Sequence, residues 1–224
     1  METYSLNFHP IFPLFKHNDL FVLLDTRADV SMGSQPIFSL FGKKHPLTFD
    51  YMGVKVTDLT KHLEKQVDVL LGVDILNDLN YLVNVKDNQL VLSEVPLDFD
   101  GTIVGSEFYL GKPLIRVEVG GKQLQLIVGT GSGLSYLPTR LIDFVEPSPE
   151  VNDFHPSLGA FRTVTSKSVL NIGPFSFETQ VGKFPKPLER IMSRSGVDGI
   201  LGAEAIKHFT LYVSKVGGVI GIKK

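Results

Sequence analysis

The chain has 224 residues, of which 43% are apolar and 21% are charged, and its formal net charge is −2. This length provides enough apolar sequence for one large domain or two small ones with buried cores. A net charge this small, with Lys and Arg scattered along the chain, excludes the strongly basic surface of nucleic-acid-binding proteins. The absence of cysteine excludes disulfides, a thiolate nucleophile and zinc held by cysteine. Its 16 Phe and 21 Gly residues, with many runs of Val, Leu and Ile, favour β-structure.

The N-terminal segment gives an expectation about location. Residues 1–15 contain neither a basic region nor a continuous apolar run, so they do not resemble a signal peptide. The longest apolar run is far below the ~20 residues that a membrane span needs. We therefore expect a cytoplasmic protein that does not contact membranes. The alternative is a processed form of a secreted protein.

The first half of the chain, residues 1–97, is predicted to be built from strands joined by short turns. A polar turn separates the first strands, and a variable middle is followed by an apolar segment, a short helix and a closing hairpin. In chain order these elements are the strands from Pro13 to Leu24 with a turn at 17–19, the apolar segment 68–76, the helix Val73–Leu79 and the hairpin 83–92.

The second half, residues 98–224, repeats this order and adds strands in its middle. Gly173-Pro174 predicts a turn between the two added strands, and Gly217-Gly218 predicts the turn of the closing hairpin. In chain order its elements are the strands from Pro113 to Gly129 with a turn at 120–122, the added strands 169–172 and 175–177, the apolar segment 198–206, the helix Ala203–His208 and the closing hairpin.

Two motifs recur in the same order, which indicates an internal duplication. Gly129 lies 104 positions after Asp25, whereas Asp198 lies 130 positions after Asp68, so the second half carries 26 extra residues between its motifs. Residues 96–101 form the expected junction. We therefore divide the chain into an N-terminal lobe, 1–97, and a C-terminal lobe, 98–224, with a 26-residue insertion. Chance similarity between two common hairpin patterns is the alternative.

The first copy of the shorter motif reads Leu-Leu-Asp-Thr-Arg-Ala-Asp at 23–29, and the second reads Ile-Val-Gly-Thr-Gly-Ser-Gly at 127–133. Two apolar residues followed by Asp-Thr-Gly-Ala/Ser are the signature of aspartic peptidases. The chain therefore resembles that family, in particular its fused, single-chain retropepsin-like and pepsin-like members. The resemblance covers nearly the whole chain, but neither copy of the motif is complete.

The resemblance implies a mostly-β, two-lobed acid protease fold. Each lobe would be closed and barrel-like, with one short helix. In this family two carboxylates, one from each lobe, hold a water between them and share a proton. The resemblance places Asp25 and Gly129 at the two catalytic positions. The other implied site residues are Thr26, Arg27, Ala28, Thr130, Gly131 and Ser132 in the active-site loops, and Leu71, Gly72, Leu201 and Gly202 beneath them.

The two copies of the motif are damaged in different places. Gly129 has no side chain where the second carboxylate belongs, which removes either the general acid or the general base, each contributing ~10²–10⁴-fold. Arg27 replaces the glycine of the motif. If that glycine has a backbone conformation closed to other residues, Arg27 adds strain on the order of 1–3 kcal/mol. Its side chain would also lie in the cleft, where it could pair with Asp25.

Other readings of these residues are weaker. A nucleotide-binding site is disfavoured, because the segment 126–133 does not match a phosphate-binding glycine motif and Pro138 interrupts the helix that should follow. A serine nucleophile is also disfavoured, because Ser132 does not lie in a G-x-S-x-G nucleophile elbow. Asp29, Asp68 and Asp198 are expected to be local hydrogen-bond partners. No metal ligands are expected, because the histidines lack ligand spacing; they are His9, His17, His45, His62, His155 and His208.

These observations predict a pseudoenzyme: an aspartic-peptidase-like monomer that no longer hydrolyses peptides, needs no cofactor, and binds a peptide or an unfolded protein segment in its interlobe cleft. The alternative is an aspartic endopeptidase whose active form differs at Arg27 and Gly129. A site formed by Asp25 of two chains is disfavoured, because the second half occupies the partner's place. Tyr51-Met52-Gly53 is either the tip of a flap over the cleft or an ordinary surface turn.

Overall fold

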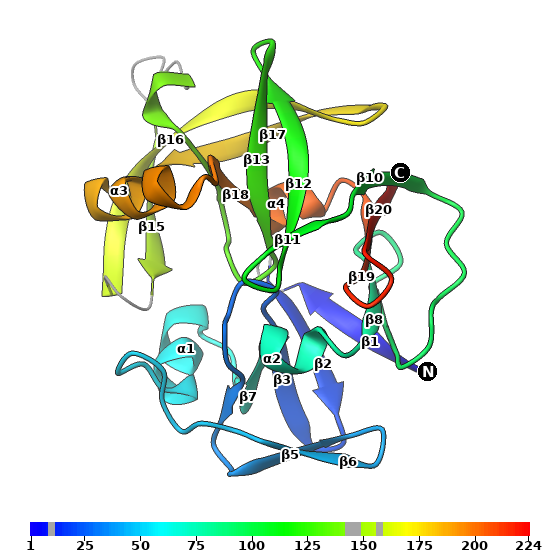
Figure 1. Ribbon diagram of the computed structural model, residues 1–224. Helices are drawn as coiled ribbons and strands as arrows, with labels where there is room; N and C mark the ends of the chain where they lie inside the picture. The colour runs from blue at the N-terminus through cyan, green and yellow to red at the C-terminus, as the bar shows by residue number, and fades with distance from the viewer. Residues whose placement is uncertain (9–11, 142–148, 156–158) are drawn as a thin grey trace.

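The computed structural model describes residues 1–8, 12–141, 149–155 and 159–224, and strands dominate it, as the composition predicts (Figure 1). His9 lies outside the described residues. The elements of the first half are β1 (Glu2–Phe8), β2 (Pro13–His17), β3 (Leu20–Leu24), β4 (Met32–Gly33), β5 (Ile37–Leu40), β6 (Lys43–Pro46), α1 (Val56–Leu63), β7 (Val69–Leu71), α2 (Val73–Leu76), β8 (Asn80–Asn84) and β9 (Gln89–Ser93).

The second half follows a segment, residues 96–100, that has no regular structure. Its elements are β10 (Thr102–Gly105), β11 (Glu107–Tyr109), β12 (Lys112–Val119), β13 (Lys122–Gly129), β14 (Ser135–Leu137), the 3-10 turn η1 (Thr139–Leu141), β15 (Glu150–His155), β16 (Gly159–Ile172), β17 (Phe175–Lys183), α3 (Lys186–Ser195), β18 (Gly199–Gly202), α4 (Ala203–Ile206), β19 (Thr210–Ser214) and β20 (Val219–Lys223).

The described strands form a ten-stranded sheet, an eight-stranded sheet and the small β5–β6 pair. The ten-stranded sheet has the order β10-β20-β19-β8-β9-β1-β2-β3-β7-β4 and therefore contains strands of both halves. They meet where β19 runs antiparallel to β8, with Tyr212 opposite Leu82. The eight-stranded sheet, β11-β12-β13-β18-β14-β17-β16-β15, has an additional pairing of β12 with β16. In Figure 1 the two halves lie one above the other, joined at one side by the shared sheet.

The strand that precedes each motif pairs in the same way in both halves. β3 lies parallel to β7, with Leu24 opposite Leu71, and β13 lies parallel to β18, with Gly129 opposite Gly202. The ends of β3 and β13 that lead into the loops, residues 22–24 and 126–129, are buried and apolar, as are β7 and β18, as expected for parallel strands covered on both faces. The motif loops therefore begin at equivalent positions in the two halves.

The predicted hairpins are present, but the helix content was underestimated. Both short helices begin where the sequence predicts, although α2 and α4 each span only four residues. The expectation of one short helix per half was wrong, because α1 and α3 are additional helices. In α1 the buried residues Val56, Leu59 and Leu63 have helical spacing, so the signal was present in the region taken as a variable middle.

Asp68 and Asp198 play the same structural part in both halves. A carboxylate oxygen of Asp68 accepts a hydrogen bond from the backbone N–H of Phe21 at 2.9 Å, and one of Asp198 accepts from Gln125 N–H at 2.9 Å. The backbone N–H of Asp68 also donates to the carbonyl of Phe21, and that of Asp198 donates to the carbonyl of Gln125, at 2.8 Å in both cases. These bonds hold the entry to β7 and β18 beside β3 and β13. These aspartates are hydrogen-bond partners, as expected, but the residues they bind lie 47 and 73 positions away and are not local in the sequence.

Removing either carboxylate is predicted to destabilise the fold. Asp68→Ala and Asp198→Ala each leave a strand N–H without its charge-assisted bond, which we expect to lower the free energy of unfolding by ~1–3 kcal/mol. Urea unfolding followed by circular dichroism measures this change. Asp19→Ala is the matched control, because the Asp19 side chain is fully exposed. Equal stability of all three variants would contradict this structural role.

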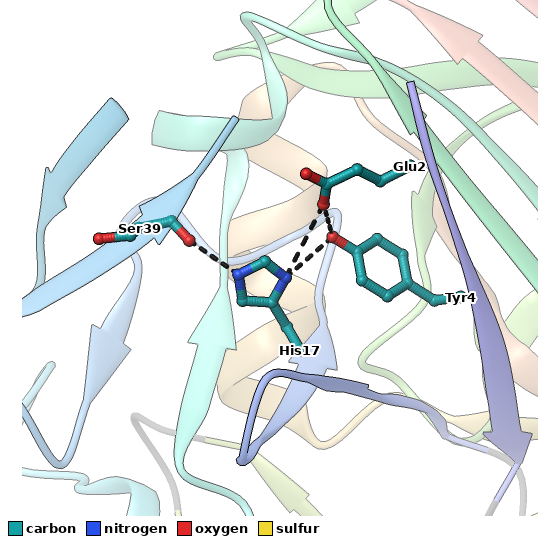
Figure 2. Close-up of polar contacts among 4 residues, drawn as sticks. All are labelled: Glu2, Tyr4, His17 and Ser39. Carbon is teal, nitrogen blue, oxygen red and sulfur yellow. Dashed lines mark hydrogen bonds and ion pairs between the residues drawn. The ribbon is translucent and has the colours of Figure 1, made fainter. Parts of the chain in front are cut away.

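His17 belongs to a separate polar cluster at one edge of the first half (Figure 2). Its Nε2 donates to the backbone carbonyl of Ser39 at 2.8 Å, and its Nδ1 lies 2.9 Å from the Tyr4 hydroxyl. The Tyr4 hydroxyl in turn donates to the Glu2 carboxylate. Figure 2 shows that these residues come from β1, β2 and β5, so the cluster joins the small β5–β6 pair to the larger sheet.

Candidate functional site

The loops that follow β3 and β13 are joined to each other by a reciprocal set of hydrogen bonds. We call residues 25–28 and 129–132 the paired loops. Thr26 Oγ1 donates to the Val128 carbonyl at 2.6 Å, and Thr130 Oγ1 donates to the Leu24 carbonyl at 2.6 Å. Each hydroxyl also accepts the backbone N–H of the other threonine at 3.1 Å. Both threonines are buried, so the bonds form in a region that excludes water.

A second tier of matching bonds supports the paired loops from below. Ser31 and Ser135 lie at equivalent positions and accept the backbone N–H of Gly72 and Gly202, at 2.9 and 3.0 Å. The carbonyls of Ala28 and Ser132 accept from Val73 and Ala203 at 2.9 and 2.7 Å, which ties each loop to the start of α2 or α4. Leu71 and Leu201 are fully buried beneath the loops. The predicted support residues therefore lie where the sequence places them.

Removing one threonine hydroxyl is predicted to destabilise the whole chain. Thr130→Val keeps the side-chain shape but leaves the buried Leu24 carbonyl and Thr26 N–H unpaired, which we expect to lower the free energy of unfolding by about 3 kcal/mol. Chemical denaturation measures this loss. Thr57→Val, at an exposed position of α1, is the control and should change stability by no more than ~0.5 kcal/mol. Similar values for the two variants would contradict the account.

Asp25 lies directly against the opposite loop. Its Oδ1 accepts the backbone N–H of Arg27 at 2.9 Å, and its own N–H donates to the Leu71 carbonyl at 3.0 Å. A Cβ atom placed on Gly131 would lie 2.2 Å from Asp25 Cγ, which is closer than any real contact. Gly131 does not have a positive φ angle. A glycine is needed there because the carboxylate of the other loop occupies the space, not because of backbone conformation.

The same relation, applied in the other direction, explains Arg27 and Gly129 together. Because the threonine bonds relate the loops reciprocally, a carboxylate on residue 129 would meet the Cβ of residue 27, as Asp25 would meet a Cβ on residue 131. A Cβ built on Gly129 would lie 3.2 Å from Cγ2 of Ile200, 3.4 Å from Oγ of Ser132 and 3.5 Å from Cδ of Arg27, so a Cβ alone would be in ordinary contact with the arginine stem. A carboxylate at residue 129 extends further, and we therefore predict that it competes with the Arg27 side chain for space.

The condition under which Arg27 would add backbone strain is not met. Arg27 does not have a positive φ angle, so its side chain adds no strain of the kind that favours glycine. Arg27 also does not form an ion pair with Asp25 or with any other residue that the structure describes. Its Nε is buried and has no hydrogen-bond partner there. A cation with an unsatisfied buried donor thus lines the same cleft as Asp25.

The Arg27 charge acts on the second half of the chain. Burial and then the nearby Arg27 guanidinium lower the pKa of His155, at the end of β15, to about 4. Burial raises the pKa of Tyr136, whose hydroxyl donates to Asp153, and Arg27 opposes that rise. The arginine side chain therefore extends from the first-half loop towards β14 and β15.

Asp25 and Arg27 lie in a cleft of about 370 Å³, which we call the central cleft. Its walls are mostly apolar and come from both halves, including Leu23, Met32, Leu59, Ile127, Leu188 and Ile200. A larger hollow of about 590 Å³ lies elsewhere, between α1 and β15, but neither Asp25 nor Arg27 lines it. The central cleft is therefore the site where the predicted catalytic positions and a ligand-sized cavity coincide.

Asp29 joins the two halves at the edge of the central cleft. Its carboxylate forms an ion pair with Lys112 at the start of β12 and accepts a hydrogen bond from the Tyr51 hydroxyl at 3.0 Å. Lys112 is buried, so its charge is compensated largely by this contact. Sequence reasoning expected a local role for Asp29 and did not identify Lys112 at all. The turn that carries Met52 does line the cleft, next to Tyr51.

A pH titration is predicted to reveal His155. Its pKa is near 6.5 in the unfolded chain and about 4 in the fold, so between these values the unfolded chain binds a proton that the folded chain does not. Stability should therefore fall as pH decreases from about 7 to 4, and this term should change no further below pH 4. Urea unfolding should show a shallower decline for His155→Phe. An identical decline would contradict the low pKa, and NMR titration in Arg27→Met should place the His155 pKa higher.

The sequence matches no protein-family model, and no curated protein is significantly similar to it. Within the described residues, His, Asp and Glu side chains do not gather into a group of three that could hold a metal ion. No helix in the described part of the chain is long and apolar enough to cross a membrane.

Proposed function

We propose that the chain is an aspartic-peptidase-like protein that does not hydrolyse peptides and that binds an extended peptide segment in the central cleft. The observation that carries this proposal is the reciprocal bonding of Thr26 and Thr130, which sets Asp25 and Gly129 at equivalent places in the paired loops. This arrangement is the one that the family resemblance implies. We extend the proposal to a two-lobed acid protease fold, with lobes 1–97 and 98–224, acting as a cytoplasmic monomer.

Hydrolysis requires a group that accepts a proton from the attacking water and a group that donates one to the scissile carbonyl. Asp25 supplies one carboxylate. Gly129 supplies none, and the space beside it holds the stem of Arg27, which cannot act as a general acid near neutral pH. The local geometry therefore favours binding without cleavage.

A second candidate is an aspartic endopeptidase of which this chain is an inactive variant. The observation that favours it is how much of the supporting structure is retained: both threonines, both supporting serines and Gly131 keep the contacts that a paired site needs. Only positions 27 and 129 depart from the motif. A chain that differed from this one at those positions alone would have both carboxylates.

Restoring the motif distinguishes the two candidates. The chain as it stands and Gly129→Asp alone should not cleave unfolded casein between pH 3 and 7, the latter because Arg27 obstructs the new carboxylate. Recovery of pepstatin-sensitive cleavage by Arg27→Gly with Gly129→Asp, removed again by Asp25→Ala, would favour the second candidate, because it would show that the supporting bonds still serve a catalytic site. A double variant that folds but remains inactive would favour the first candidate, a peptide-binding protein whose site has changed beyond these two positions. Cleavage by the unmodified chain that Asp25→Ala abolishes would overturn the proposal.

A further inference from the structure

Three exposed apolar side chains stand at the rim of the central cleft. Met52, Leu110 and Ile191 are 59%, 70% and 59% exposed, and all three line the cleft. They come from separate elements: the turn after Tyr51, the β11–β12 turn, and α3. Single exposed apolar residues are ordinary, but three that converge on one cavity indicate a surface that a ligand covers.

Two of these residues occupy backbone positions that disfavour them. Met52 and Leu110 have φ angles of 54° and 48°, each just before a glycine in a two-residue turn. Asn and Asp are the usual residues there, because they tolerate the left-handed conformation. The chain follows that rule at Asn18 and Asn88, whose φ angles are 53° and 51°.

Core packing accounts for a further exception but not for the two at the cleft. Phe41 also has a positive φ angle, and its side chain packs against the main core. Met52 and Leu110 belong to none of the core clusters of the described residues. An apolar side chain that adds strain and gains no packing within the chain is explained if it packs against something else.

Asp29 fixes both of these turns relative to the cleft. Its carboxylate binds the hydroxyl of Tyr51, which precedes Met52, and the ammonium group of Lys112, which follows Leu110 by two residues. The two tips are thus held by one side chain that directly follows the first paired loop. Such preorganisation lowers the entropy lost when a ligand is bound.

Two carboxylates, Asp25 and Asp29, and two cations, Arg27 and Lys112, line the cleft. Asp29 and Lys112 form an ion pair, whereas Arg27 forms no ion pair with Asp25 or another described residue. The low pKa of His155 keeps its ring neutral near pH 7. The remaining guanidinium, that of Arg27, has a buried Nε without a partner in the described structure. A carboxylate on the ligand would supply the planar acceptor that this group matches.

We propose that the central cleft selects extended peptide segments in which apolar residues flank one acidic side chain. The acidic side chain pairs with Arg27, and the flanking residues pack on Met52, Leu110 and Ile191. This inference rests on the proposed peptide-binding function and names the class of peptide. The three apolar residues lie on separate elements. An extended peptide, whose side chains project at intervals, can contact all three, whereas a single hydrocarbon chain such as a fatty acid matches this arrangement less well.

Fluorescence anisotropy with two labelled hexapeptide mixtures tests the charge selection. Both mixtures carry Leu, Val, Phe and Ala at five of the six positions, and the third residue is Glu in one mixture and Gln in the other. The unmodified chain should bind the Glu mixture at least tenfold more tightly, and Arg27→Met should remove that difference. Equal affinities would overturn the acidic preference but leave peptide binding intact. Failure to bind either mixture would overturn the proposed function as well.

Two further experiments test whether binding depends on the three rim residues rather than on any exposed apolar residue, and whether the ligand is a peptide rather than a fatty acid. Met52→Asn with Leu110→Asn should weaken binding at least tenfold without loss of thermal stability, because Asn suits both turns. Val216→Asn is the control: Val216 is 78% exposed and does not line the cleft, so binding should not change. If Val216→Asn weakened peptide binding as much as the double variant, the proposed contact of the peptide with Met52 and Leu110 would be overturned. Displacement of the peptides by millimolar octanoate, with tighter binding of octanoate itself, would overturn the choice of a peptide.

Discussion

The reciprocal hydrogen bonds of Thr26 and Thr130 are the constraint on which the rest of the site depends. Each hydroxyl bonds to the opposite chain segment as both donor and acceptor, and all the groups concerned are buried. Neither loop can move without leaving buried polar groups of the other unpaired. This mutual dependence sets Asp25 against Gly131, and it sets Gly129 beside Arg27. The geometry of the central cleft follows from the same bonds, because its floor consists of the two loops they join.

Arg27 and Gly129 form one coupled departure from the motif. In a reciprocal pair of loops, a carboxylate on one side needs a glycine on the other, as Asp25 and Gly131 show. We therefore expect a side chain at position 27 and a carboxylate at position 129 to compete for the same space. The arginine gives the cleft a cation where the paired site would have a second acid. The same two positions thus account both for the missing second carboxylate and for the positive charge that Arg27 brings to the cleft.

Sequence reasoning recovered the strands next to the two motifs, the hairpin turns and the starts of α2 and α4, because these carry local patterns that recur at fixed positions. It did not predict other strands, among them β1, β5, β6 and β15. It missed α1 and α3, which lie in the segments that differ between the halves, so the repeat gave no guide there. It also missed the contact of Asp29 with Lys112 and the effect of Arg27 on the pKa of His155. Those depend on how distant segments pack, and no spacing in the sequence encodes that packing. The direction of Arg27 was likewise set by the opposite loop.

The central claim is that positions 27 and 129 compete for one space across the paired loops. A thermodynamic cycle measures this directly: urea unfolding of the chain as it stands, Arg27→Gly, Gly129→Asp and the double variant. We predict that Gly129→Asp destabilises the chain by ~1–3 kcal/mol when Arg27 is present and by much less when residue 27 is glycine, with an interaction energy of at least about 1 kcal/mol. Effects that add within about 0.3–0.5 kcal/mol would show that the two positions are independent and would contradict the account.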